Sequence, residues 1–158
     1  MPNVRPARHP RLDLARQDHL SLGPEARKRA DVALQQGRLG VSAISFREIT
    51  MLIAKGRITL ALPPTAWRRD LLSLGLVEIP VDGAIGIAAA QLYLHGDPAD
   101  RIIAAIAQVK GAVLLTADQP LLQWNNALER CDAQIKFVGR IRRANPPTLK
   151  VVKIFRAS

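Results

Sequence analysis

The sequence is poor in cysteine, which excludes two common ways of stabilising a fold. Cys131 is the single cysteine among 158 residues. It cannot form a disulfide within the chain, and it cannot build a zinc site from several thiolates. A free cysteine usually packs as a small apolar side chain. We therefore expect Cys131 to lie in a hydrophobic core.

Long apolar runs are also lacking, although 48% of the residues are hydrophobic. No stretch of about 18 apolar residues offers a membrane-spanning helix. The arginine-rich start, MPNVRPARHPR, is not followed by the apolar segment of a secretory signal. The length is typical of one globular domain. These features predict a soluble, cytoplasmic protein with no membrane partner.

Aromatic residues make up only 4% of the chain, so few rings are present to stack on unpaired bases. The formal net charge of +10 nevertheless favours a polyanionic partner such as RNA. Seven of the 23 basic residues lie in 1–30 and seven in 136–158, whereas 31–135 holds nine basic and ten acidic residues. The positive charge therefore belongs to the two ends of the chain, and the middle is balanced.

Apolar segments in the middle alternate between strand-like and helix-like spacing. Helices are expected over residues 24–36, 46–56, 63–75, 83–94, 98–110 and 119–130, and strands over 39–45, 76–80 and 112–116, with 135–139 as a further candidate edge strand. Such alternation predicts a mostly parallel sheet with helices on both faces, a three-layer α/β/α fold.

The same pattern sets the expected domain limits. Residues 20–139 form the predicted domain, because the alternation of strands and helices falls within them. Residues 1–19 are rich in arginine and proline without a hydrophobic period, and we interpret them as an irregular basic segment. Residues 140–158 include adjacent prolines and an excess of positive charge, and we interpret them as a basic tail.

Three acidic residues follow the predicted strands or open the helix beside them. Glu48 comes just beyond the strand at 39–45, Asp100 lies in the first turn of its helix, and Asp118 comes two residues after Thr116. In a parallel sheet these positions share one edge. Grouped carboxylates repel one another unless a cation lies between them, and oxygen ligands favour Mg²⁺ or Mn²⁺. Since such an ion can activate a water against a phosphodiester, the pattern indicates a nuclease site.

Each acid also has a structural interpretation, and the residues alone leave both open. Ser45 and Glu48 have the spacing of a helix capping box. Asp97 and Asp100 are both favoured at the positive end of a helix dipole, and Asp118 can cap the helix that follows it. Of these, Asp97 is assigned to capping, because the start of its helix requires a cap.

Two segments resemble the signature regions of PIN-domain proteins, specifically VapC-type toxins of toxin–antitoxin pairs. They are VSAISFREITMLIAKGRI and LHGDPADRIIAAIAQVKGAVLLTAD, and the resemblance spans roughly residues 20–132. It implies an α/β/α fold, Mg²⁺-dependent endoribonuclease activity, a homodimer, and inhibition by a cognate antitoxin protein. The family's acidic metal ligands fall on Glu48, Asp100 and Asp118, and Thr116 matches a supporting hydroxyl.

The start of the chain departs from that family. Its members normally begin with an apolar strand ending in Asp-Thr, whose aspartate is a fourth carboxylate of the site. Residues 1–10, MPNVRPARHP, contain neither an apolar run nor a carboxylate. We therefore expect the first strand and its acid to be absent, and the activity to be impaired.

The leading hypothesis is a Mg²⁺-dependent endoribonuclease toxin. One alternative is a catalytically inactive PIN-like protein that only binds an antitoxin. Another is a basic RNA-binding module that uses the ends of the chain, which leaves the three acids without a role.

Overall fold

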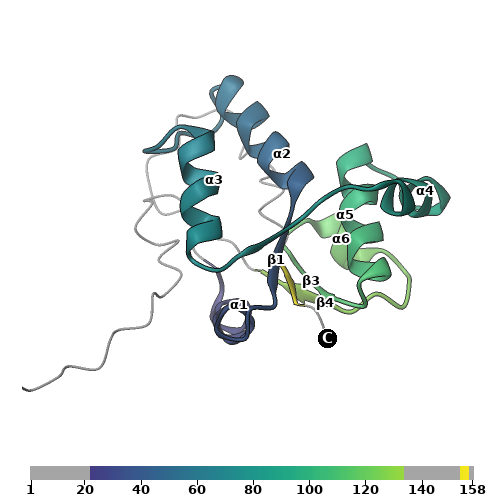
Figure 1. Cartoon of the computed structure of the whole chain (residues 1–158). Coiled ribbons are helices and arrows are strands. Elements are labelled where there is room, and N and C mark those ends of the chain that lie inside the picture. The colour runs from purple at the N-terminus through teal and green to yellow at the C-terminus, as the bar shows by residue number, and fades with distance from the viewer. Residues whose placement is uncertain (1–21, 134–153, 157–158) are drawn as a thin grey trace, which may run out of the picture.

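The computed structural model describes residues 22–133 and 154–156 (Figure 1). The helices are α1 (Pro24–Gln35), α2 (Ala43–Ala54), α3 (Pro64–Ser73), α4 (Gly83–Gln91), α5 (Pro98–Val109) and α6 (Gln119–Gln123). The strands are β1 (Leu39–Ser42), β2 (Val77–Ile79), β3 (Val113–Thr116), β4 (Arg130–Asp132) and β5 (Ile154–Arg156).

The strands form one sheet in the order β2-β1-β5-β3-β4. β1 pairs in parallel with β2, and β3 pairs in parallel with β4. β5 lies between β1 and β3 and is antiparallel to both. Consequently β1 and β3 run in the same direction, and four of the five strands are parallel to one another. The expectation of a mostly parallel sheet is confirmed.

Hydrophobic side chains pack on both faces of this sheet, as β3 shows most clearly. Val113 and Leu115 belong to a core with residues of α1, α2 and α3, whereas Leu114 belongs to a core with residues of α4, α5 and α6. Since successive side chains of a strand point to opposite faces, these two cores lie on opposite sides of the sheet. The expected three-layer α/β/α architecture is confirmed, with α3 on the left and α4, α5 and α6 on the right of Figure 1.

Several helix limits follow local signals that the sequence carries. Asp97 caps α5, as expected, because its Oδ1 accepts a hydrogen bond from the backbone N–H of Ala99 at 2.9 Å. Gly37 follows α1 with a φ of +65°, a left-handed conformation that glycine adopts without strain. Cys131 lies in a core, also as expected.

The first strand ends earlier than the sequence pattern predicts. Residues 39–45 were expected in it, but β1 ends at Ser42, whose hydroxyl accepts a hydrogen bond from the N–H of Ile44 at 3.3 Å and caps α2. Ser45 therefore lies inside α2, and the capping box of Ser45 and Glu48 is wrong. The reason is that the earlier serine already satisfies a free N–H of the first turn.

The expected helix over residues 119–130 is wrong in its second half. α6 ends at Gln123, and Arg130 belongs to β4, which pairs with β3. The Arg130 guanidinium donates to the backbone carbonyls of Leu121 at 2.9 Å and Asn126 at 3.2 Å. These bonds satisfy carbonyls that would bond within the helix if α6 continued. The connection between α6 and β4 is therefore irregular.

The ends of the chain are described only in part. Three expectations concern residues outside the described ones. They are the candidate edge strand at 135–139, the irregular segment at 1–19, and the absence of the family's first strand from residues 1–10. Of the expected tail at 140–158, the structure describes Ile154–Arg156, and these residues are a strand in the middle of the sheet. For them the interpretation as a tail is wrong, because backbone pairing with two neighbours outweighs their charged surroundings in the sequence. Among the helices described, none is long and apolar enough to span a membrane.

Candidate active site

The carboxyl ends of β1 and β3 lie at the same level in the sheet. Ile154 of β5 pairs with Val41 on one side and with Leu115 on the other. The next residues along the two parallel strands, Ser42 and Thr116, are therefore level with each other, and both are fully buried. Since β5 lies between them, their strands are about 10 Å apart, twice the usual spacing.

Asp118 follows the end of β3 and is held by backbone hydrogen bonds. The Thr116 hydroxyl accepts a bond from the N–H of Asp118 at 3.1 Å, which fixes the turn after the strand. Asp118 Oδ1 accepts a bond from the N–H of Leu121 at 3.1 Å and caps α6. The residue is only 2% exposed. Its other oxygen, Oδ2, accepts no hydrogen bond from the part of the chain that the structure describes.

Asp100 reaches the same end of the sheet from α5. The chain reverses after α5, where the N–H of Ala112 donates to the carbonyl of Ala107 at 2.8 Å, and β3 begins. α5 therefore runs against β3, and its first turn, with Asp100, lies near the carboxyl end of the strand. Asp100 is 5% exposed. A side chain at Gly96, whose φ is +151°, would bring a Cβ to 3.5 Å from Asp100 Oδ2, so the loop before α5 packs closely on this carboxylate.

Glu48 lies in the second turn of α2, beyond the carboxyl end of β1. Its side chain is 15% exposed, and its Oε1 lies 3.0 Å from Nη1 of Arg47. α2 contacts α5, the helix that carries Asp100. Within residues 22–133, where all the candidate acids lie, no group of three or more His, Cys, Asp or Glu side chains is arranged to hold a metal ion. The three acids thus lie toward one end of the sheet without forming a complete ligand set.

The structure gives Ser45, expected as a helix cap, a different position, as a buried polar side chain within α2. Ser45 is 4% exposed, and its hydroxyl has no hydrogen-bond partner among residues 22–133 and 154–156. It precedes Glu48 by three residues, so the two share a face of α2. The signal in the sequence, a serine three residues before a glutamate, was interpreted as a capping box. Because α2 begins at Ala43 and Ser42 caps it, the Ser45 hydroxyl does not cap the helix.

Comparison with known proteins assigns the fold. The family model described as PIN domain matches residues 18–123, more than half of the chain. The chain belongs to the PIN-domain family. The residues that match the family model include Glu48, Asp100 and Asp118.

A curated relative is Ribonuclease VapC22 from Mycobacterium tuberculosis (strain ATCC 25618 / H37Rv), which is 38% identical over 84 residues. The match covers 52% of this chain and 65% of the relative. The resemblance to PIN-domain proteins of the VapC type is thereby confirmed. No solved structure shows significant similarity to the chain.

Proposed function

We propose that this PIN-domain protein is a Mg²⁺-dependent endoribonuclease toxin that cleaves RNA phosphodiester bonds with an activated water. Mn²⁺ has the same ligand preference and can replace Mg²⁺. The observation that carries the proposal is the burial of Asp100 and Asp118 at the carboxyl edge of the sheet. The similarity to a protein named ribonuclease supports the choice of RNA as substrate.

The described residues fit a Mg²⁺ ion. Burying a carboxylate is costly unless hydrogen bonds or a cation compensate it. Asp118 receives one backbone bond at Oδ1, and its Oδ2 has none from the described residues. Mg²⁺ is usually bound by one or two carboxylates, with waters and substrate phosphate oxygens completing its shell. We therefore propose Asp100 and Asp118 as the direct ligands of the ion, with waters and phosphate oxygens in its remaining positions.

The residues around this pair have separate tasks in the proposed reaction. The Thr116 hydroxyl holds the turn that carries Asp118. Glu48, the most exposed of the three acids, accepts a hydrogen bond from the attacking water once its carboxylate leaves Arg47. Asp100 and Asp118 would hold the divalent ion, which would lower the pKa of that water and stabilise the leaving oxygen. The basic residues at both ends of the chain attract the RNA backbone.

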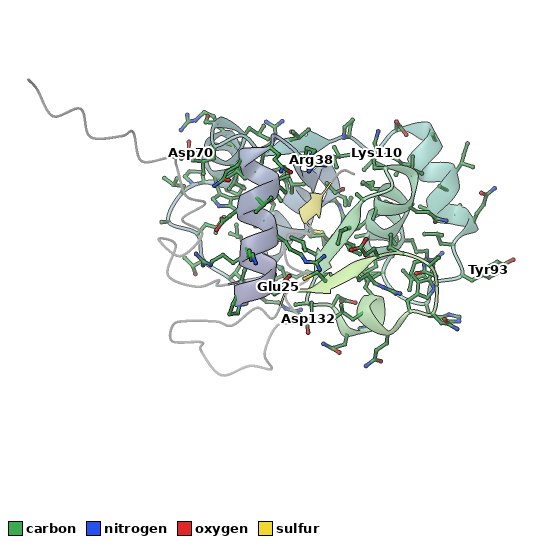
Figure 2. All side chains as sticks on the ribbon, turned by 90° about the horizontal axis from the view of Figure 1, so that it is seen from below. Glu25, Arg38, Asp70, Tyr93, Lys110 and Asp132 are labelled. Atoms are coloured by element: carbon green, nitrogen blue, oxygen red, sulfur yellow. The ribbon has the colours of Figure 1, made fainter. Side chains whose placement is uncertain are left out.

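The proposed partners are a cognate antitoxin protein and a second copy of the chain. Two large apolar side chains near α4 are available to protein partners. Ile87 is 65% exposed and Tyr93 is 96% exposed, and Figure 2 shows Tyr93 pointing away from the molecule. Exposed apolar groups of this size favour contact with other proteins.

The test is cleavage of a structured RNA by the purified full chain in Mg²⁺. We expect cleavage that EDTA abolishes and that Asp100→Asn lowers by about 10²- to 10³-fold, the usual loss on removing an electrostatic group from a catalytic site. Asp97→Asn is the matched control. It makes the same substitution three residues before Asp100, and asparagine still caps α5. Equal losses in the two variants would show that only the start of α5 matters and would contradict the proposal.

A second candidate function is a catalytically inactive PIN-like protein that binds an antitoxin. The absence of a three-acid metal cluster from residues 22–133 favours it. A stable complex with an antitoxin, without RNA cleavage in Mg²⁺ or Mn²⁺, would support this candidate. RNA binding that weakens steeply with salt, again without cleavage, would instead support the basic RNA-binding module.

A further inference from the structure

The sheet consists of two halves that β5 joins. We call α1, β1, α2, α3 and β2 the Glu48 half, and α4, α5, β3, α6 and β4 the aspartate half. β1 pairs with β2 and β5, and β3 pairs with β4 and β5. In the sheet as described, β1 and β3 do not pair with each other. Figure 1 shows β5 in yellow at the centre, between the two halves.

The pairing of β5 also determines the level at which the halves meet. Phe155 is the register partner of both Gly40 and Leu114, and Ile154 pairs in the same way one residue nearer the candidate site. A shift of one strand by a single residue would move its half by about 3.3 Å along the strand direction. Such a shift would also turn its side chains to the opposite face of the sheet. The halves described here are also connected by the contact of α2 with α5. In addition, Val113, Leu115 and Cys131 of the aspartate half share a hydrophobic core with residues of α1, α2 and α3.

We propose that β5 is a positioning element of the candidate active site, which holds Glu48 at a set distance and level from Asp100 and Asp118. The inference about catalysis rests on the proposed function, whereas the inference about the two halves does not. The strand between β1 and β3 is the segment Ile154–Arg156 of the same molecule. A segment near the other end of the sequence from β1 thus acts together with the shared core to set how the acids face one another.

The position of β5 makes its backbone sensitive to proline. Each residue of a central strand directs its N–H and C=O to one neighbour or the other. Phe155→Pro therefore removes a ladder hydrogen bond whichever neighbour Phe155 serves. Phe155→Leu keeps the N–H and an apolar side chain and is the conservative control. Val77→Pro is the matched proline control, because Val77 is the first residue of the edge strand β2, where proline is tolerated.

The first measurement is residue-resolved amide hydrogen exchange of the unmodified full chain. We expect the amides of Ile154–Arg156 to exchange more than about 100-fold slower than in an unstructured peptide, as paired core strands do. In Phe155→Pro, residues 39–41 and 113–115 should both exchange faster. In Val77→Pro the effect should be confined to 39–41 and spare 113–115.

The second measurement is the distance between the halves. Spin labels at Lys55→Cys, after α2, and Lys110→Cys, after α5, report it in a Cys131→Ala background, and both lysines are exposed. We expect one narrow distance distribution for the parent and for Phe155→Leu, and a broadened one for Phe155→Pro. Mn²⁺ affinity and RNA cleavage should fall about tenfold or more in Phe155→Pro alone among these variants.

The outcomes separate the two proposals. Fast exchange of Ile154–Arg156 in the unmodified chain would overturn the role of β5, whether or not the protein is a nuclease. An unchanged distance distribution, Mn²⁺ affinity and cleavage in Phe155→Pro would overturn it as well. Exchange of β5 between two labelled copies would overturn the assignment to the same molecule. If the parent neither binds Mn²⁺ nor cleaves RNA, the proposed function fails, and the exchange and distance measurements still decide the role of β5.

A milder variant keeps the experiment decisive if Phe155→Pro does not fold. Ile154→Gly weakens a strand without removing an N–H. It should broaden the distance distribution less than proline and more than Phe155→Leu. No difference between Ile154→Gly and Phe155→Leu, with slow exchange retained at residues 39–41 and 113–115, would also count against the positioning role.

Discussion

The two halves of the candidate active site hold their carboxylates in different ways. In the aspartate half, Asp100 and Asp118 are 5% and 2% exposed, and both lie at helix starts next to the sheet. In the Glu48 half, the carboxylate lies in the second turn of α2 and is paired with Arg47. An acid at a helix start is oriented by the backbone before any ligand binds, whereas an acid within a helix depends on its side-chain neighbours.

The largest expected difference between the halves is in catalysis by the buried acid. Asp118→Asn should lower RNA cleavage by about 10²- to 10³-fold, because asparagine keeps the shape and the cap but lacks the negative charge. Single-turnover cleavage in Mg²⁺ measures the loss, with thermal unfolding as the control for folding. A variant that cleaves at the parent's rate would remove Asp118 from the proposed site.

A smaller loss is expected in the other half. Glu48→Gln should lower cleavage by about tenfold, within the lower range for a group that assists proton transfer. The glutamate is more exposed than the aspartates and is already paired with Arg47, so a neutral amide replaces it at less cost. The same single-turnover assay measures this ratio. Equal losses for Glu48→Gln and Asp118→Asn would show that the two halves contribute alike and would break the comparison.

The capping role of Asp118 can be separated from its charge by stability measurements. Asp118→Ala should lower the free energy of unfolding by about 1 kcal/mol, the usual value of a helix cap, while Asp118→Asn should lower it by much less. Urea unfolding of the three proteins gives this comparison. If alanine and asparagine destabilise equally, the bond to Leu121 contributes little, and burial alone explains the position of the acid.

The smallest expected effect concerns Cys131, which lies in β4 of the aspartate half. Burial raises the pKa of its thiol above the ordinary value of 9.0. The neutral thiol therefore favours the folded state; this stabilisation is complete below the pKa of the unfolded chain and is lost as pH rises through the folded pKa. Unfolding free energy should thus decline above about pH 9 in the parent and less in Cys131→Ala. Identical pH profiles of the parent and Cys131→Ala would contradict a contribution of the buried thiol to stability.

Prediction from the sequence succeeded where the decisive interactions are local. Asp97 as a cap, Gly37 after its helix and the alternation of strands with helices depend on residues within a few positions of one another. The start of α2 was misplaced, because Ser42 and Ser45 are both possible caps and the sequence does not rank them. The site residues remain a proposal, since their spacing across the sheet is not a local property.

The sequence by itself determined where the helices lie and that β1, β2 and β3 are strands, because side-chain periodicity and helix caps act over short distances. It also determined that acids follow the ends of strands. Only the tertiary structure decided that three residues near the end of the chain form the central strand, antiparallel to their neighbours. The physical reason is that a short strand has no stable pairing of its own; its place depends on the backbone groups that β1 and β3 leave to be paired.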